Sequence, residues 1–131
     1  MPGYADLFVG GIKPGQSTAL ENSHRIAVGT GALTTLSVLN FDTTARLILL
    51  FDTASATQPT NGAGATPVYF FPIAAGTSNG PAQGLGFDWT IPPLQFTNGL
   101  WIVVSSTITT PFTLTAVTTN QCCFVWQINQ A

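Results

Sequence analysis

The chain has 131 residues, which is enough for one domain with a hydrophobic core. Only 6% of its residues are charged, against about 25% in ordinary soluble domains, whereas 45% are hydrophobic. These proportions exclude an intrinsically disordered chain and a charged coiled coil. Three Lys and Arg residues and a net charge of -2 also argue against a nucleic-acid partner, whose phosphates attract many cations.

The sequence gives no indication of a membrane span or a secretory signal. The longest apolar runs, residues 47–51 and 100–104, are far shorter than the about 20 residues of a spanning helix. The first cation is Lys13, and the apolar run at residues 7–9 is too short for a signal peptide. We therefore expect synthesis in a cytoplasm and no membrane partner. A surface with so little charge also favours self-association.

Residues 1–25 differ from the rest of the chain and predict an extended N-terminal arm. They combine Gly and Pro with a polar stretch that ends at Asn22, and their periodicity is weak. We expect the arm to dock on its own domain or on a neighbour through four apolar anchors, Tyr4, Leu7, Phe8 and Ile12.

Residues 26–131 predict a β-sandwich domain, because Val, Ile, Thr and aromatic residues alternate with Gly, Pro, Asn and Asp clusters. The expected strands are residues 36–41, 46–52, 68–73, 86–90, 94–97, 100–105, 112–116 and 122–129. Asn98-Gly99 predicts a tight hairpin. The absence of helical segments excludes parallel βαβ folds. The expected class is all-β, an antiparallel two-sheet sandwich with a jelly roll as the favoured topology.

Three strands carry more detailed expectations. Residues 46–52 are apolar on both faces, which predicts a central strand or one that a partner covers. Pro72 marks a sheet edge, a bulge or a strand end. In the strand at residues 112–116, Phe112, Leu114 and Ala116 share one face.

The side chains that catalysis and metal binding require are sparse. His24 is the single histidine, and no second His or Cys lies near it. Asp42 and Asp52 are expected to stabilise turns, with a calcium site at Asp52 as the alternative. Cys122 and Cys123 are adjacent, which favours free buried thiols over an intermolecular bridge. No activated nucleophile is recognisable, so we expect neither an enzyme nor a cofactor.

The three tryptophans have two interpretations. Trp101 and Trp126 lie in strongly apolar strands, which favours core packing. Trp89 is the more exposed candidate, and together with Tyr69 and Tyr4 it is suited to stacking on sugars. A carbohydrate-binding module is therefore an alternative function.

Four segments carry a resemblance to a known group of proteins. Leu-Ser-Val-Leu-Asn at residues 36–40 is followed by Ala-Arg-Leu-Ile-Leu-Leu-Phe-Asp-Thr-Ala-Ser at residues 45–55. Thr66-Pro67 then leads into an apolar strand that contains Pro72, and Asn98-Gly99 leads into another. This order resembles that of small tailed-phage virion proteins over residues 36–106. The chain departs from it at Leu49, where a charged residue is common, and in the longer loop at residues 53–67.

The resemblance implies a capsid cement or decoration protein with a jelly-roll-like sandwich and no catalytic residues. The implied partners are the major capsid protein and further copies of the chain, in a trimer or dimer on the capsid surface of the virion. The expected interface residues are Tyr4, Leu7, Phe8, Ile12 and Trp89. A tail or neck accessory subunit and a carbohydrate-binding receptor-recognition module are the alternatives.

Overall fold

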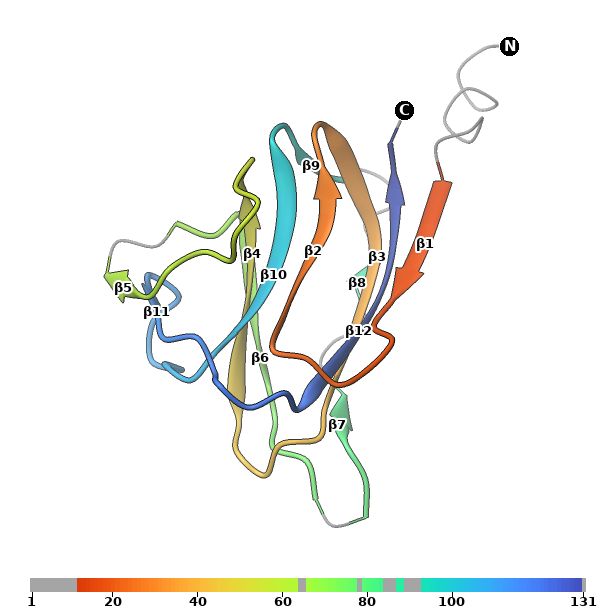
Figure 1. Cartoon of the computed structure of the whole chain (residues 1–131). Coiled ribbons are helices and arrows are strands. Elements are labelled where there is room, and N and C mark those ends of the chain that lie inside the picture. Colours follow the sequence, from red (N-terminus) through yellow and green to blue (C-terminus); the bar gives the residue numbers. More distant parts are fainter. Residues whose placement is uncertain (1–11, 64–65, 78, 84–86, 89–92, 131) are drawn as a thin grey trace.

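The computed structural model describes residues 12–63, 66–77, 79–83, 87–88 and 93–130. These residues form strands, turns and loops; no helix occurs among them, and so none is long and apolar enough to cross a membrane. Two antiparallel sheets pack face to face (Figure 1), which confirms the all-β sandwich expected from the sequence.

The first sheet is built around the long strand β3. Its strands are β1 (Ile12–Gln16), β12 (Cys122–Asn129) and β3 (Gly31–Asn40), in this order across the sheet. Three short strands pair in turn with the far edge of β3: β9 (Leu94–Phe96), β8 (Phe87–Asp88) and β7 (Ala82–Gln83).

The second sheet has four strands, in the order β2 (Ser23–Val28), β10 (Gly99–Ser105), β4 (Arg46–Asp52) and β6 (Tyr69–Ile73). A separate pair, β5 (Gly62–Ala63) and β11 (Thr113–Leu114), lies beside β4 in Figure 1. We call this pair, together with loop residues 53–61 and 106–112, the covering layer. β6 lies at an edge of its sheet, as Pro72 predicted.

The main core lies between the two sheets. Alternate residues of β12, Phe124, Trp126 and Ile128, point inward and are buried. They pack with inward-facing residues of β4 and β10 such as Leu50 and Ile102. Trp101 and Trp126 are both buried, which confirms the packing role predicted for them.

Two glycines let large rings lie across a neighbouring strand. Gly15 pairs with Trp126, and a Cβ atom at Gly15 would lie only 2.4 Å from the indole ring. Gly31 pairs with Phe96 in the same way, with a Cβ atom 2.7 Å from the phenyl ring. Only a residue without a side chain fits under these rings.

A second hydrophobic cluster explains why β4 is apolar on both faces. Leu47, Leu49 and Phe51 point away from the main core, and Trp101 and Val103 of β10 lie beside them. Leu114 of β11 packs on this surface and is 1% exposed. The sequence predicted that β4 is a central strand or that a partner covers it. In the structure, the chain's own covering layer provides most of this cover.

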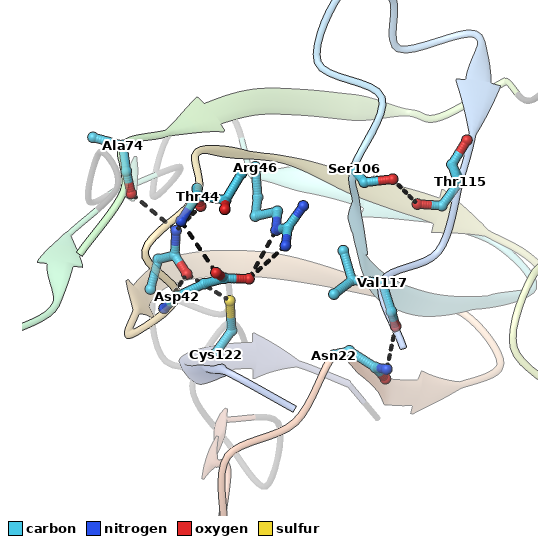
Figure 2. A network of polar contacts seen from close by, with 10 residues as sticks. Asn22, Asp42, Thr44, Arg46, Ala74, Ser106, Thr115, Val117 and Cys122 are labelled. Atoms are coloured by element: carbon cyan, nitrogen blue, oxygen red, sulfur yellow. Dashed lines mark hydrogen bonds and ion pairs between the residues drawn. The ribbon is translucent and has the colours of Figure 1, made fainter. Parts of the chain in front are cut away.

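Four polar contacts hold the covering layer and the adjoining residues 115–117 in place, and the last two are drawn in Figure 2. Trp101 Nε1 donates a hydrogen bond of 2.9 Å to the Ser55 carbonyl oxygen. The Ala116 amide donates to Asn61 Oδ1 at 2.8 Å. Asn22 Nδ2 donates to the Val117 carbonyl oxygen, and Ser106 Oγ donates to the Thr115 carbonyl oxygen at 3.3 Å.

The Asn98-Gly99 turn differs from its prediction as a hairpin. It joins β9 in the first sheet to β10 in the second, so the two strands do not pair with each other. Gly99 has a φ of 148° and its missing Cβ would lie 2.6 Å from the Thr53 carbonyl oxygen. The glycine is therefore needed for a corner between the sheets.

Two further segments differ from the expected elements. Residues 12–25, which the sequence assigned to the arm, contribute β1 to the first sheet and the beginning of β2 to the second. In the strand at residues 112–116, Leu114 and Ala116 pack inward, but Phe112 is 56% exposed because the paired strand begins at Thr113.

Candidate functional site

A compact polar network closes the β3–β4 turn (Figure 2). Asn40 is fully buried, and its Nδ2 donates to the carbonyl oxygens of Thr44 at 3.1 Å and Ala74 at 2.9 Å. Its Oδ1 accepts the Asp42 amide at 2.9 Å, with Cys122 Sγ 3.6 Å away. Every polar atom of the Asn40 side chain is thus used inside the fold.

Asp42 and Arg46 form an ion pair in the same turn. Arg46 Nη2 lies 2.6 Å from Asp42 Oδ2, and the Thr44 amide donates to Asp42 Oδ1 at 3.1 Å. Burial alone would raise the pKa of Asp42, but Arg46 and the amides of Thr43 and Thr44 outweigh it and lower the pKa. The predicted turn role of Asp42 is confirmed.

Asp52 stabilises a turn that is distant in the sequence. Its Oδ2 accepts the Thr97 amide at 2.9 Å, and its Oδ1 accepts the Asn98 amide at 2.8 Å. Burial raises the pKa of Asp52, but the hydrogen bonds from Thr97, Asn98 and Gly99 lower it below its ordinary value. Its carboxylate oxygens therefore hold the corner between the sheets.

Ser17, Glu21 and His24 form the one group that approaches a catalytic composition among the described residues. Ser17 Oγ donates to Glu21 Oε1 at 2.6 Å, and His24 Nδ1 lies 2.9 Å from the same carboxylate oxygen. The carboxylate thus stands between the hydroxyl and the imidazole, whereas a nucleophilic triad needs the imidazole beside the hydroxyl. His24 instead packs on Trp126, with ring centroids 4.6 Å apart.

The thiols are free, and metal-ligating side chains do not gather in the described part of the chain. No three His, Cys, Asp or Glu residues there lie close enough to hold a metal ion. Cys122 is buried and Cys123 is half-buried. Burial, with the charge of Asp42 nearby, raises the pKa of Cys122 to about 12, which keeps this thiol protonated and unreactive.

Two shallow cavities adjoin the covering layer. One of about 320 Å³ lies between Phe51, Thr60 and Leu114, and one of about 510 Å³ lies between Asn22, Thr60 and Thr118. Hydroxyl, amide and proline side chains dominate both linings, and neither contains Lys, Arg, His or Cys. Asp52 is the one ionisable side chain in these two linings, and its oxygens accept the amide hydrogen bonds described above.

The outer face of the first sheet is mixed in character and carries no charge on its three long strands. By register and alternation, the side chains on this face are Ile12, Pro14, Gln16, Ala32, Thr35, Ser37, Leu39, Cys123, Val125, Gln127 and Asn129. Val125 lies near the middle of this face and is 49% exposed. No second hydrophobic cluster forms on this face among the described residues.

A second candidate surface is the β6 strip, which consists of Val68, Phe70 and Pro72. Phe70 and Pro72 alternate in β6 with buried Phe71 and Ile73, so they share its outer side, and exposed Val68 directly precedes the strand. Val68 and Phe70 are 42% and 45% exposed. Apolar side chains exposed in sequence along an edge strand are typical of an association surface.

Most of the predicted interface residues are not placed by the structure. Tyr4, Leu7, Phe8 and Trp89 lie outside the described residues. Ile12 is described, and it is exposed on the outer face of β1. The sequence interpretation missed Val125 and Phe70, although their alternation with buried neighbours would have identified both as outward-facing.

The comparisons with known proteins identify no relative. No model of a known protein family matches the chain, and no curated protein is recognisably similar to it in sequence. The functional argument therefore depends on the residues and their geometry.

Proposed function

We propose that the chain is a structural virion subunit, a capsid cement or decoration protein that binds the phage head across neighbouring capsomers. The turn-and-strand pattern at residues 36–106 supports this role, and so does the neutral antiparallel sandwich. The polar side chains around the β3–β4 turn and the corner at Asp52 hold the fold together, which leaves neutral surfaces for association.

The strand order supports the jelly-roll interpretation of the sandwich. If β7, β8 and β9 are counted as one interrupted strand, the chain contributes eight strands to the two main sheets. In chain order these strands then lie side by side as 1-8-3-6 in one sheet and 2-7-4-5 in the other. That is the order of a jelly roll with two Greek keys, an architecture that viral capsid proteins and lectins share. The fold by itself therefore does not decide between these functions.

The single observation that carries the proposal is the β6 strip. Val68 and Phe70 expose apolar surface at an edge of the second sheet. Of the charges on β4, Arg46 is paired with Asp42, and the Asp52 carboxylate accepts the amides of Thr97 and Asn98. We assign this strip to the major capsid protein, with the anchors Tyr4, Leu7 and Phe8 as a second attachment. Many weakly bound copies then act together on one shell, which stabilises it without a single tight contact.

Co-sedimentation with phage shells that lack this protein tests the proposal. The wild-type protein should pellet with the shells at a fixed stoichiometry, and Phe70→Asp should bind about tenfold more weakly or worse, because it places a charge in an apolar contact. Phe112→Asp is the matched control, since Phe112 is a similarly exposed phenylalanine in the covering layer.

Each outcome of this experiment is informative. A wild-type protein that stays in the supernatant would overturn the head location and favour a tail or neck subunit. Equal loss in Phe70→Asp and Phe112→Asp would contradict the assignment to β6. The carbohydrate-binding alternative has no comparable support, because Tyr69 packs against the core beside Phe71.

A further inference from the structure

We infer that, in the free protein, residues 1–11 fold back over the outer face of the first sheet of their own chain. These residues lie outside the described part of the structure, so the inference rests on the face that they cover, on the point where they join it and on their sequence. It goes beyond the proposed function, because it concerns the subunit before it meets a shell.

The face carries an apolar patch on its two inner strands, β12 and β3. We call it the inner-strand patch, and its residues are Leu39, Phe41, Cys123 and Val125. Cys123 pairs with Leu39, and Val125 follows two residues later on the same side of β12. Phe41 comes directly after the inward-facing Asn40 and donates its amide hydrogen to the Gln121 carbonyl oxygen. Val125 and Phe41 are 49% and 41% exposed, so the described residues leave the patch open to solvent.

The described chain begins on this same face, close to the patch. Ile12 is 36% exposed on the outer side of β1, which lies beside β12 at the edge of the sheet (Figure 1). Gln16, four residues further along β1, pairs with Val125, so Val125 is about 14 Å from Ile12 along the strands and Cys123 about 20 Å. Residues 1–11 are therefore attached within reach of the patch.

Two glycines directly before Ile12 permit the chain to reverse its direction. Gly10 and Gly11 can adopt the positive φ values of a tight turn, which other residues rarely accept. Residues 1–9, when extended, then reach up to about 30 Å back from Ile12, beyond both Val125 and Cys123. Pro14 cannot donate an amide hydrogen, which makes β1 a poor partner for a further strand and favours the face over the edge.

Alternation along an extended segment divides residues 1–9 into two rows. One row has no polar side chain and consists of Met1, Gly3, Ala5, Leu7 and Val9. The other row contains Asp6 between Tyr4 and Phe8, and a carboxylate placed on apolar side chains would lose its hydration. Leu7 and its row therefore face the patch, while Tyr4 and Phe8 stay on the outer side, available as the second attachment to a shell.

The attachment decides between this segment and any other occupant. A segment joined to its site through a short link meets that site at an effective concentration in the millimolar range. A second copy or another protein would need a concentration of that order, or a far tighter contact, to displace it. The chain covers the outer face of its second sheet in the same way, with Leu114 from its own covering layer.

Alkylation of the Cys123 thiol with iodoacetamide tests the inference on the full-length protein, in a Cys122→Ala background. Leu7→Ser should speed the reaction severalfold, because it releases the segment that covers the patch. Phe8→Ser is the matched control, since it removes the neighbouring apolar side chain from the outward row, and it should leave the rate unchanged. Circular dichroism and thermal unfolding establish that the variants fold. Equal rates in all three proteins, or equal acceleration by both substitutions, would overturn the inference.

Two further measurements locate the contact and identify its occupant. Val125→Ser should also speed the alkylation, and adding Leu7→Ser to it should have little further effect, because both changes remove the same contact. Additive effects would contradict docking on Val125. Docking within one chain gives alkylation rates that do not change with protein concentration. Protection that grows with concentration would assign the face to a second copy and overturn the inference.

The inference and the proposed function fail separately, because alkylation is measured on the free protein. If Leu7→Ser speeds alkylation but the wild type never pellets with shells, the decoration role fails while the docking of residues 1–11 stands. If the wild type pellets but Leu7→Ser leaves alkylation unchanged, the docking fails while the decoration role stands.

Discussion

The outer faces of the two sheets are treated in opposite ways. On the second sheet, an apolar surface formed by Leu49, Trp101 and Val103 is covered by Leu114 of the chain itself. On the first sheet, the corresponding face mixes Thr, Ser and Gln with Val125, and no hydrophobic cluster forms over it in the described part of the chain. A strand that is apolar on both faces therefore does not by itself indicate a partner.

The low charge of the chain has two explanations, burial of apolar residues within the chain and a surface used for association, and the comparison separates them. Part of the apolar composition is used internally, because the covering layer buries a third layer of side chains on the second sheet. The remaining neutral surface, on the face of the first sheet and along β6, is the part available for association. Four predictions test this contrast, in order of decreasing change in stability.

Leu114→Asp should break the contrast by uncovering the second sheet. It removes a leucine that is 1% exposed and places a carboxylate on Leu49 and Trp101, so we expect the free energy of unfolding to fall by more than about 4 kcal/mol. Val125→Asp, the same kind of change on the first sheet, should cost less than about 1 kcal/mol. Urea denaturation measures both, and equal costs would show that the two faces are alike.

The two adjacent cysteines lie on opposite faces of the first sheet, so their thiols report on its inside and its outside. Cys122 faces inward with a pKa raised from 9.0 to about 12, so the protonated thiol is favoured by folding. The contribution of the Cys122 thiol to the free energy of unfolding is then complete below pH 9. It is lost as the pH rises toward 12, which lowers the free energy of unfolding by up to about 4 kcal/mol. Denaturation at several alkaline pH values should show this loss. The loss should shrink in Cys122→Ala but persist in Cys123→Ala, and an unchanged slope in Cys122→Ala would contradict the assignment.

Asp52 tests the corner that joins the two sheets. Asp52→Ala leaves the amides of Thr97 and Asn98 without their charged acceptor, so we expect a loss of about 2 kcal/mol at pH 7. Because folding lowers the pKa of Asp52, its contribution is present above the unfolded value of 3.8 and is lost as the pH falls through the folded pKa. The difference from wild type should therefore disappear in acid, and a difference independent of pH would exclude a role for the charge.

Trp101→Phe should lower the free energy of unfolding least of the four substitutions. It keeps an aromatic ring under the covering layer but removes the hydrogen bond to the Ser55 carbonyl oxygen, which costs about 1 kcal/mol. Hydrogen exchange should accelerate in residues 53–61 and leave β12 unchanged. Faster exchange in β12 as well would mean that the two outer faces are coupled through the core.

Local patterns predicted much of the architecture. Period-two alternation in residues 122–129 placed Phe124, Trp126 and Ile128 together, and the structure buries all three. Pro72 lies on an edge strand, which is one of the three positions that the sequence predicted for it. The boundaries at β1 and β2 were missed because Ser, Gly and Pro give these strands low β-propensity, and pairing with β12 and β10 overrides it.

The candidate surfaces were less accessible to sequence reasoning. Ile12 was recognised as an anchor, but its partner across the first sheet, Asn129, is more than 100 positions away in the chain. Strand register, not spacing, decides which side chains share a face, and register depends on long-range pairing. The Asn98-Gly99 turn shows the same limit, because a tight turn was predictable but its use between two sheets was not.

Local sequence patterns were enough to establish the all-β class, the alternation that builds the core and the turn role of Asp42. These properties depend on residue type and on neighbours within a few positions. Long-range pairing was needed to show that the chain covers its own second sheet, that Asp52 reaches a turn 45 residues away, and that Val125 lies on the outer face of the first sheet. Burial and pairing between distant segments are collective properties of the fold, and no local pattern specifies them.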